Sequence, residues 1–182
     1  MATWKIEASH TEINFKTRHL LISTVSGHFS KFEGTVEANS SDFTDAQINF
    51  SADIDSITTK DERRDGHLKS PDFFDAANHP KLLFVSKSLT KNAVGEYELT
   101  GDLTIRGITK EVKLNVSFNG SAKTFGGTEV AAFEITGSIN RFDFGLQWNA
   151  LTEVGGIALG EQVKIEANVE LNKVVAETLQ AA

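Results

Sequence analysis

Apolar and polar residues alternate along most of this chain, and no other feature restricts its fold as strongly. Between residues 47 and 54 the even positions are apolar and the odd positions are polar. A period of two is what a half-buried antiparallel strand requires, because successive side chains point to opposite faces of the sheet. Similar segments recur at 3–8, 12–19, 27–38, 81–89, 97–107, 112–120, 131–140 and 163–171. The chain therefore predicts an antiparallel all-β fold.

The number and spacing of these segments favour a single sandwich or up-and-down barrel. They amount to about eight strands joined by turns rich in Gly, Asn, Ser and Thr. At 182 residues the chain is long enough for one good-sized core and short for two domains. We expect one domain over residues 1–175 and a C-terminal tail over 176–182.

Two segments interrupt the alternation. Residues 20–27, "LLISTVSG", are too crowded with apolar side chains for a clean alternating strand and indicate a turn or a short helix. Residues 58–70 are typical of a short helix, capped by Thr58 or Thr59 and ended by Pro71. One or two short helices should therefore accompany the strands.

The bulk composition narrows the range of partners. The net charge of -7 works against nucleic acid or an anionic membrane surface as the main partner. The absence of cysteine removes disulfides and thiolate chemistry. No segment approaches the roughly 20 apolar residues of a membrane span, so no stable membrane insertion is expected. Without a recognisable signal peptide we expect a cytoplasmic protein; a periplasmic domain with its signal removed would have the same sequence.

An eight-stranded barrel is at the size where its interior is either filled by its own side chains or open to one small ligand. Several positions on the apolar faces are small, namely Ala52, Gly101, Ala131, Gly137 and Ala167. The chain also has 13 phenylalanines, many of them on the same faces. Small residues opposite large ones are compatible with tight packing and equally with a channel walled by rings.

Three motifs relate the chain to a known family. Residues 67–84, "HLKSPDFFDAANHPKLLF", 99–114, "LTGDLTIRGITKEVKL", and 139–148, "INRFDFGLQW", occur in that order. Together they resemble the signatures of the YceI family, the polyisoprenoid-binding, lipocalin-like proteins. The resemblance implies an eight-stranded antiparallel lipocalin-like barrel that holds a long apolar molecule lengthwise. It also allows for a homodimer.

The first motif contains the adjacent pair Phe73 and Phe74, which is unusual bulk for a connecting loop. We expect the short helix and this pair to cap one flank of the barrel. One ring would enter the interior and the other would pack beneath the helix. The alternative is that both rings are ordinary core residues that anchor the loop.

Combining the alternating pattern with the resemblance gives a set of expected ligand-binding residues. Arg141 is included for a polar head group, with a salt bridge to Asp143 or Asp102 as the alternative. Arg18 and Arg106 are further single cations beside apolar strands. Phe142 is expected to narrow one end of the channel. The apolar members are Phe15, Phe32, Phe50, Ile54, Phe73, Phe74, Phe84, Leu103, Ile105, Phe133, Ile135, Phe142 and Phe144.

No pattern in the sequence indicates catalysis or metal binding. The histidines lack metal-site spacing, and His19 with His28 is the best pair available. Most carboxylates occupy the polar faces of strands, and no nucleophile elbow or phosphate loop is present. We expect a non-enzymatic protein with no catalytic residue, metal or cofactor apart from a bound lipid.

The sequence thus predicts a protein that binds a long-chain lipid inside a barrel for carriage, storage or sequestration. The lipid would be a polyisoprenoid, a prenyl quinone or a fatty-acid derivative. The alternative is a self-filled structural or stress-related barrel that acts through its surface.

Overall fold

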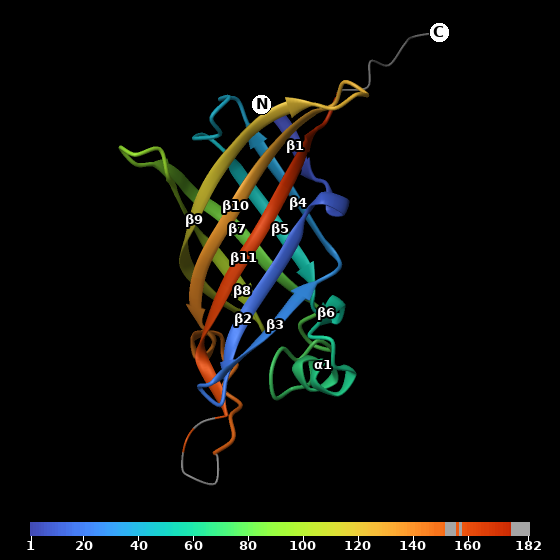
Figure 1. The fold of residues 1–182 in the computed structure, drawn as a ribbon, viewed down its shortest axis with the longest axis vertical. Helices are drawn as coiled ribbons and strands as arrows, with labels where there is room; N and C mark the ends of the chain where they lie inside the picture. Colours follow the sequence, from blue (N-terminus) through green and yellow to red (C-terminus); the bar gives the residue numbers. More distant parts are fainter. Residues whose placement is uncertain (152–155, 157, 176–182) are drawn as a thin grey trace.

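The chain forms an elongated antiparallel barrel in a computed structural model that describes residues 1–151, 156 and 158–175 (Figure 1). The expected eight-stranded barrel is confirmed. Hydrogen bonds between the first and last strands, with Trp4 opposite Lys173, close the cylinder. The expected tail at 176–182 lies outside the described residues. None of the described helices has the length and apolarity needed to cross a membrane.

Three of the eight barrel strands are interrupted, so each consists of two labelled strand segments. We call each complete barrel strand, whether it has one segment or two, a stave. The first stave is β1 (Ala2–Ile6) and β2 (Glu12–His19), separated by the 3-10 helix η1 (Ala8–His10). It pairs with a second stave made of β3 (Ser23–Phe29) and β4 (Phe32–Ala38). The third is β5 (Gln47–Asp53), the 3-10 helix η2 (Ile54–Ser56) and β6 (Ile57–Thr58).

The other five staves are long and follow one another around the barrel. The bounds are β7 (Lys81–Lys91), β8 (Tyr97–Ile105), β9 (Ile108–Lys123), β10 (Glu129–Asn140) and β11 (Leu159–Lys173), with the 3-10 helix η3 (Arg141–Phe144) after β10. Each pairs antiparallel with its neighbour in sequence. A bulge in β7 between Ser86 and Ser88 reverses which side chains face inward along the rest of that strand.

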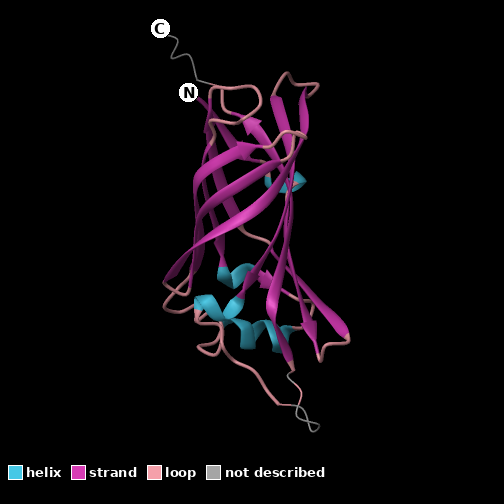
Figure 2. Ribbon diagram, turned by 90° about the vertical axis from the view of Figure 1, so that its left-hand side faces the viewer, coloured by secondary structure: helices cyan, strands magenta, loops and turns pink. Residues whose placement is uncertain are grey.

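The predicted helix and turn are both present at one end of the barrel, the lower end in Figure 1. Residues 20–22 form the β2–β3 turn, whereas residues 23–27 of the segment expected to be a turn or short helix belong to strand β3, so that part of the expectation was wrong. The helix α1 spans Glu62–Lys69, and Figure 2 shows it across that end. Its expected threonine cap was wrong: Asp61 caps it instead, accepting a hydrogen bond from the Arg64 backbone N–H at 3.0 Å.

Large side chains fold over glycines on neighbouring strands inside the barrel. A Cβ at Gly101 would collide with the Phe84 ring, and one at Gly137 would collide with Leu114. The alternation of small and large inward residues is therefore partly a packing device. This packing nevertheless leaves an open space along the barrel axis.

Candidate functional site

The barrel encloses a cavity of about 260 Å³ that is lined by side chains from all eight staves. Its wall is predominantly aliphatic and aromatic, and the polar residues that border it are Asn14, Thr17, Thr35, Asn49 and Arg141. Ligand pockets usually measure about 300–1,000 Å³, so this cavity is just below that range. A fully self-filled interior would leave no such volume. The arrangement suits a slender apolar guest.

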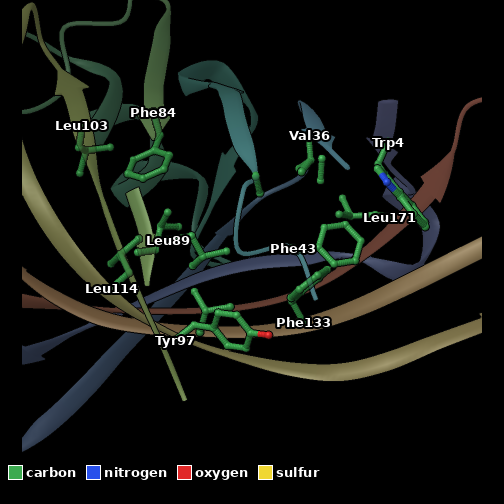
Figure 3. Close-up of a cluster of buried hydrophobic side chains, with 14 of the residues drawn as sticks. Trp4, Val36, Phe43, Phe84, Leu89, Tyr97, Leu103, Leu114, Phe133 and Leu171 are labelled. Atoms are coloured by element: carbon green, nitrogen blue, oxygen red, sulfur yellow. The ribbon is translucent and has the colours of Figure 1, made fainter. Parts of the chain in front are cut away.

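Phe43 closes the cavity at the upper end. It lies in the β4–β5 loop, is only 2% exposed and borders the cavity. Its ring centroid is 5.1 Å from those of Trp4 and Phe133, and Figure 3 shows it beside Phe133 and Leu171. The Tyr97 hydroxyl donates to the Asp42 carbonyl at 2.8 Å and so ties the loop to the barrel wall.

A second hollow of about 430 Å³ lies on the other side of Phe43, which borders both spaces. Its walls include Ser40, Ser41 and Lys123. On its wall, Lys173 of β11 donates to Glu129 of the paired strand β10 at 2.7 Å, and this hydrogen bond lowers the pKa of Glu129. The Phe43 ring thus lies between an apolar interior and an outer hollow whose wall contains both polar and apolar residues.

A lid formed by α1 and the loop after it covers part of the lower end. Leu68 of α1 and both rings of the Phe73–Phe74 pair border the cavity. We expected one ring to enter the interior and the other to pack beneath the helix. This division was wrong, because Phe73 borders the cavity and also packs against α1, where its ring centroid is 5.0 Å from that of His67. Phe74 packs against Phe29 at 6.4 Å.

Arg106, in the β8–β9 turn, holds this lid in place. Its Nη1 donates to the Pro71 carbonyl at 2.6 Å and to the Phe73 carbonyl at 2.8 Å. These bonds cross from the barrel wall to the loop that carries the aromatic pair. The structure thus gives Arg106 a role in positioning the lid.

Arg141 is a buried cation at the lower end, 3% exposed. Nε donates to Gly160, Nη1 to Leu146 and Trp148, and Nη2 to Leu159, all to backbone carbonyls at 2.6–3.2 Å. Burial lowers its pKa, and Glu161 acts in the opposite direction. The alternative of a salt bridge to Asp143 or Asp102 was wrong, since within the described structure Arg141 makes no ion pair and Asp102 pairs with Lys87 at 3.2 Å.

Most of the residues expected to bind the ligand lie around this cavity. The ten that border it are Phe15, Phe50, Phe73, Phe74, Phe84, Leu103, Ile105, Phe133, Ile135 and Arg141. The four that do not are Phe32, Ile54, Phe142 and Phe144. Ile54 and Phe144 are buried in the 3-10 helices η2 and η3, where the strand period no longer applies. Phe142 does not border the cavity, so the expectation that it narrows one end was wrong; its ring packs against the Arg141 guanidinium at 4.7 Å instead.

Two important wall residues escaped the sequence analysis. Phe43 lies in a loop and has a left-handed backbone, with φ at 61°. Leu89 faces inward only because the β7 bulge shifts the alternation by one residue. The sequence of the 40–46 loop contains one feature that could have pointed to Phe43, namely a single aromatic residue among polar ones.

The histidine pair singled out in the sequence does not converge. His19 is opposite Ser23 at the turn, whereas His28 is opposite Asn14 farther along the hairpin. No group of three or more His, Asp or Glu side chains that could hold a metal occurs within the described part of the chain.

The fold and its cavity define a small antiparallel barrel with an apolar interior, the class that includes ligand-holding barrels. A family model described as "YceI-like domain" matches residues 4–171. A UPF0312 protein of Staphylococcus aureus (strain N315) is 39% identical over 173 residues, 94% of this chain and 98% of the relative. The chain belongs to the YceI family.

Solved structures agree on the architecture. The Campylobacter jejuni YCEI protein is 28% identical, with a TM-score of 0.74 over 87% of this chain and 90% of its own. BcnA of Burkholderia cenocepacia is 20% identical, with a TM-score of 0.75 over 91% and 98%. A polyisoprenoid binding domain from Saccharophagus degradans is 13% identical, with a TM-score of 0.65 over 94% and 98%. The last two similarities support the fold alone.

Proposed function

We propose that this protein binds one long-chain apolar lipid, a polyisoprenoid or a similar chain, lengthwise inside the barrel. The observation that carries the proposal is the cavity of about 260 Å³ with an almost wholly apolar wall. The choice of ligand class is motivated by the membership of the YceI family and by the name of the Saccharophagus domain, which has the same fold and is described as polyisoprenoid binding. The lipid would be carried, stored or sequestered.

The energetics favour a chain over a compact molecule. Each methylene removed from water contributes about 0.8 kcal/mol, so affinity should rise with chain length until the cavity is full. Drug-sized ligands return only about 0.3 kcal/mol per heavy atom, which sets a realistic upper limit. A wall with few polar groups selects for length and shape and discriminates weakly between chemical types.

We extend the proposal to a non-catalytic role. Among the described wall residues, Arg141 is the only ionisable side chain. Its guanidinium donates to four backbone carbonyls, which favours a structural role over a reactive one. The cytoplasmic location and the homodimer stay predictions, which cell fractionation and solution scattering will test.

A displacement titration tests the proposed function. A dansylated farnesyl probe is bound to the purified protein and then displaced by unlabelled prenols of increasing length. We expect saturable binding of one probe per chain and tighter competition by longer prenols. Absence of saturable binding by any apolar chain would refute the proposal and leave the surface-acting barrel as the better account.

A further inference from the structure

The turn between β2 and β3 presents three consecutive aliphatic side chains to solvent. Leu20, Leu21 and Ile22 are 41%, 61% and 82% exposed. Leu151, 79% exposed, lies nearby, because Ala158 accepts a hydrogen bond from Leu20 and donates one to Ala150. The turn lies at the lower end of the barrel (Figure 1). Clustered exposed aliphatic residues commonly mark a surface that contacts something apolar.

The backbone conformation of this turn makes leucine an unfavourable residue at two of its positions. Leu20 and Leu21 have φ angles of 53° and 61°, in the left-handed region where Gly, Asn and Asp are favoured. Leucine at these positions adds steric strain and, being exposed, recovers little from burial. The reason for leucine therefore lies outside the isolated chain.

The chain segment on either side of the turn carries a net positive charge, opposite in sign to that of the whole protein. Residues 13–32 contain no Asp or Glu, although the chain carries a net charge of -7. They include Lys16, Arg18 and Lys31. Lys16 pairs with Glu166 at 3.1 Å, whereas Arg18 is exposed and in no ion pair within the described residues. The overall charge, which disfavours an anionic surface, does not describe this hairpin.

The cavity reaches the level of the turn. Thr17 of β2 and Leu159 and Val163 of β11 border the cavity. In the pairing of these two strands, Leu159 is opposite His19, the residue directly before the turn. The exposed aliphatic residues are thus adjacent to one end of the apolar interior.

We propose that the β2–β3 turn, with Leu151, docks on the surface of an anionic lipid bilayer. The aliphatic side chains enter the interfacial region and Arg18 meets anionic head groups. Docking brings the lower end of the cavity to the bilayer, where a long-chain lipid is collected or delivered; this purpose rests on the proposed function. A second copy of the chain is a poorer occupant, because a stable dimer buries about 800 Å² per partner, more than four side chains supply.

Site-specific fluorescence tests the docking directly. Because the chain has no cysteine, a single introduced cysteine can be labelled selectively. Ile22→Cys and Val94→Cys are each labelled with the environment-sensitive dye NBD. Val94 is a matched control, 79% exposed in the β7–β8 turn away from the lower end (Figure 1). On vesicles of phosphatidylcholine and phosphatidylglycerol, NBD at position 22 should brighten and shift to the blue, and NBD at position 94 should not. No response at position 22, or equal responses at both, would overturn the proposal.

A double variant, L21S/I22S, separates docking from lipid holding. We expect its apparent dissociation constant for the same vesicles to rise at least tenfold, while displacement titrations without vesicles give wild-type affinities. Unchanged vesicle binding would overturn the docking proposal. So would a dimer, formed without vesicles, that L21S/I22S abolishes, since the turn would then be a contact between copies. Vesicle binding by a wild-type protein that takes up no prenyl probe would instead refute the proposed function and leave the docking surface in place.

Discussion

Removing the Phe43 ring should open the upper end of the cavity. Phe43 borders both the apolar interior and the outer hollow, and it is 2% exposed. Its ring contacts those of Trp4, Phe118 and Phe133 at centroid distances of 5.1–5.5 Å. In Phe43→Ala nothing else in the β4–β5 loop replaces the ring between the two spaces.

The cost in stability follows from the burial of the ring. Truncating a buried phenylalanine to alanine typically costs about 3–5 kcal/mol, which includes the lost ring contacts. Alanine keeps the left-handed backbone of this position, so no strain is released. We expect the free energy of unfolding in urea to fall by about 3–5 kcal/mol.

The effect on the ligand is the distinguishing measurement. Stopped-flow release of the dansylated farnesyl probe should accelerate at least about tenfold, equivalent to roughly 1.4 kcal/mol of barrier. Ile57→Ala is the control, because Ile57 is 3% exposed but does not border the cavity. It should lose about 2–5 kcal/mol of stability and keep the wild-type release rate. Equal release rates in both variants would refute the assignment of Phe43 as the closure.

Three further changes test other parts of the structure. Ala167→Phe should fill the cavity and weaken probe binding at least tenfold, whereas the outward-facing Ala132→Phe should not; equal affinities would contradict the lining assigned to β11. Arg141→Lys should lower the free energy of unfolding by about 1–3 kcal/mol, because an ammonium cannot serve all four carbonyls; wild-type stability in urea would contradict this role. The hydrogen bond from the Arg64 backbone lowers the pKa of Asp61, so its contribution to α1 is present above the unfolded-state pKa of about 3.9 and is lost as the pH falls through the lower folded-state value. Hydrogen exchange should show α1 losing protection in that acid range, and Asp61→Asn, which caps without titrating, should lose no protection there; identical pH profiles would contradict the argument.

The alternation of residue types predicted much of the fold, because it reports directly which side chains face the axis. It placed Phe15, Phe50 and Leu103 on inward faces, and all three border the cavity. It failed at Ile54, where a 3-10 turn replaces the period of two with a period of three, and it did not extend to Phe144, which lies in the family motif at 139–148 and also falls in a 3-10 turn.

Other features depend on contacts between distant parts of the chain and leave no local pattern. The inward position of Leu89 depends on a bulge, and the plug at Phe43 depends on a loop conformation. The partners of Arg141 are backbone carbonyls, which any residue provides, so no sequence pattern could have shown them. The size of the cavity depends on how rings such as Phe84 fold over their neighbouring glycines.

Native mass spectrometry of the protein, purified without detergent, is the most direct test of whether a long-chain lipid occupies the cavity. The account predicts a one-to-one complex whose added mass is released by organic solvent and belongs to a long-chain lipid. A protein that arrives empty and stays empty after incubation with prenols would contradict it, since an apolar space of this size would then have no occupant.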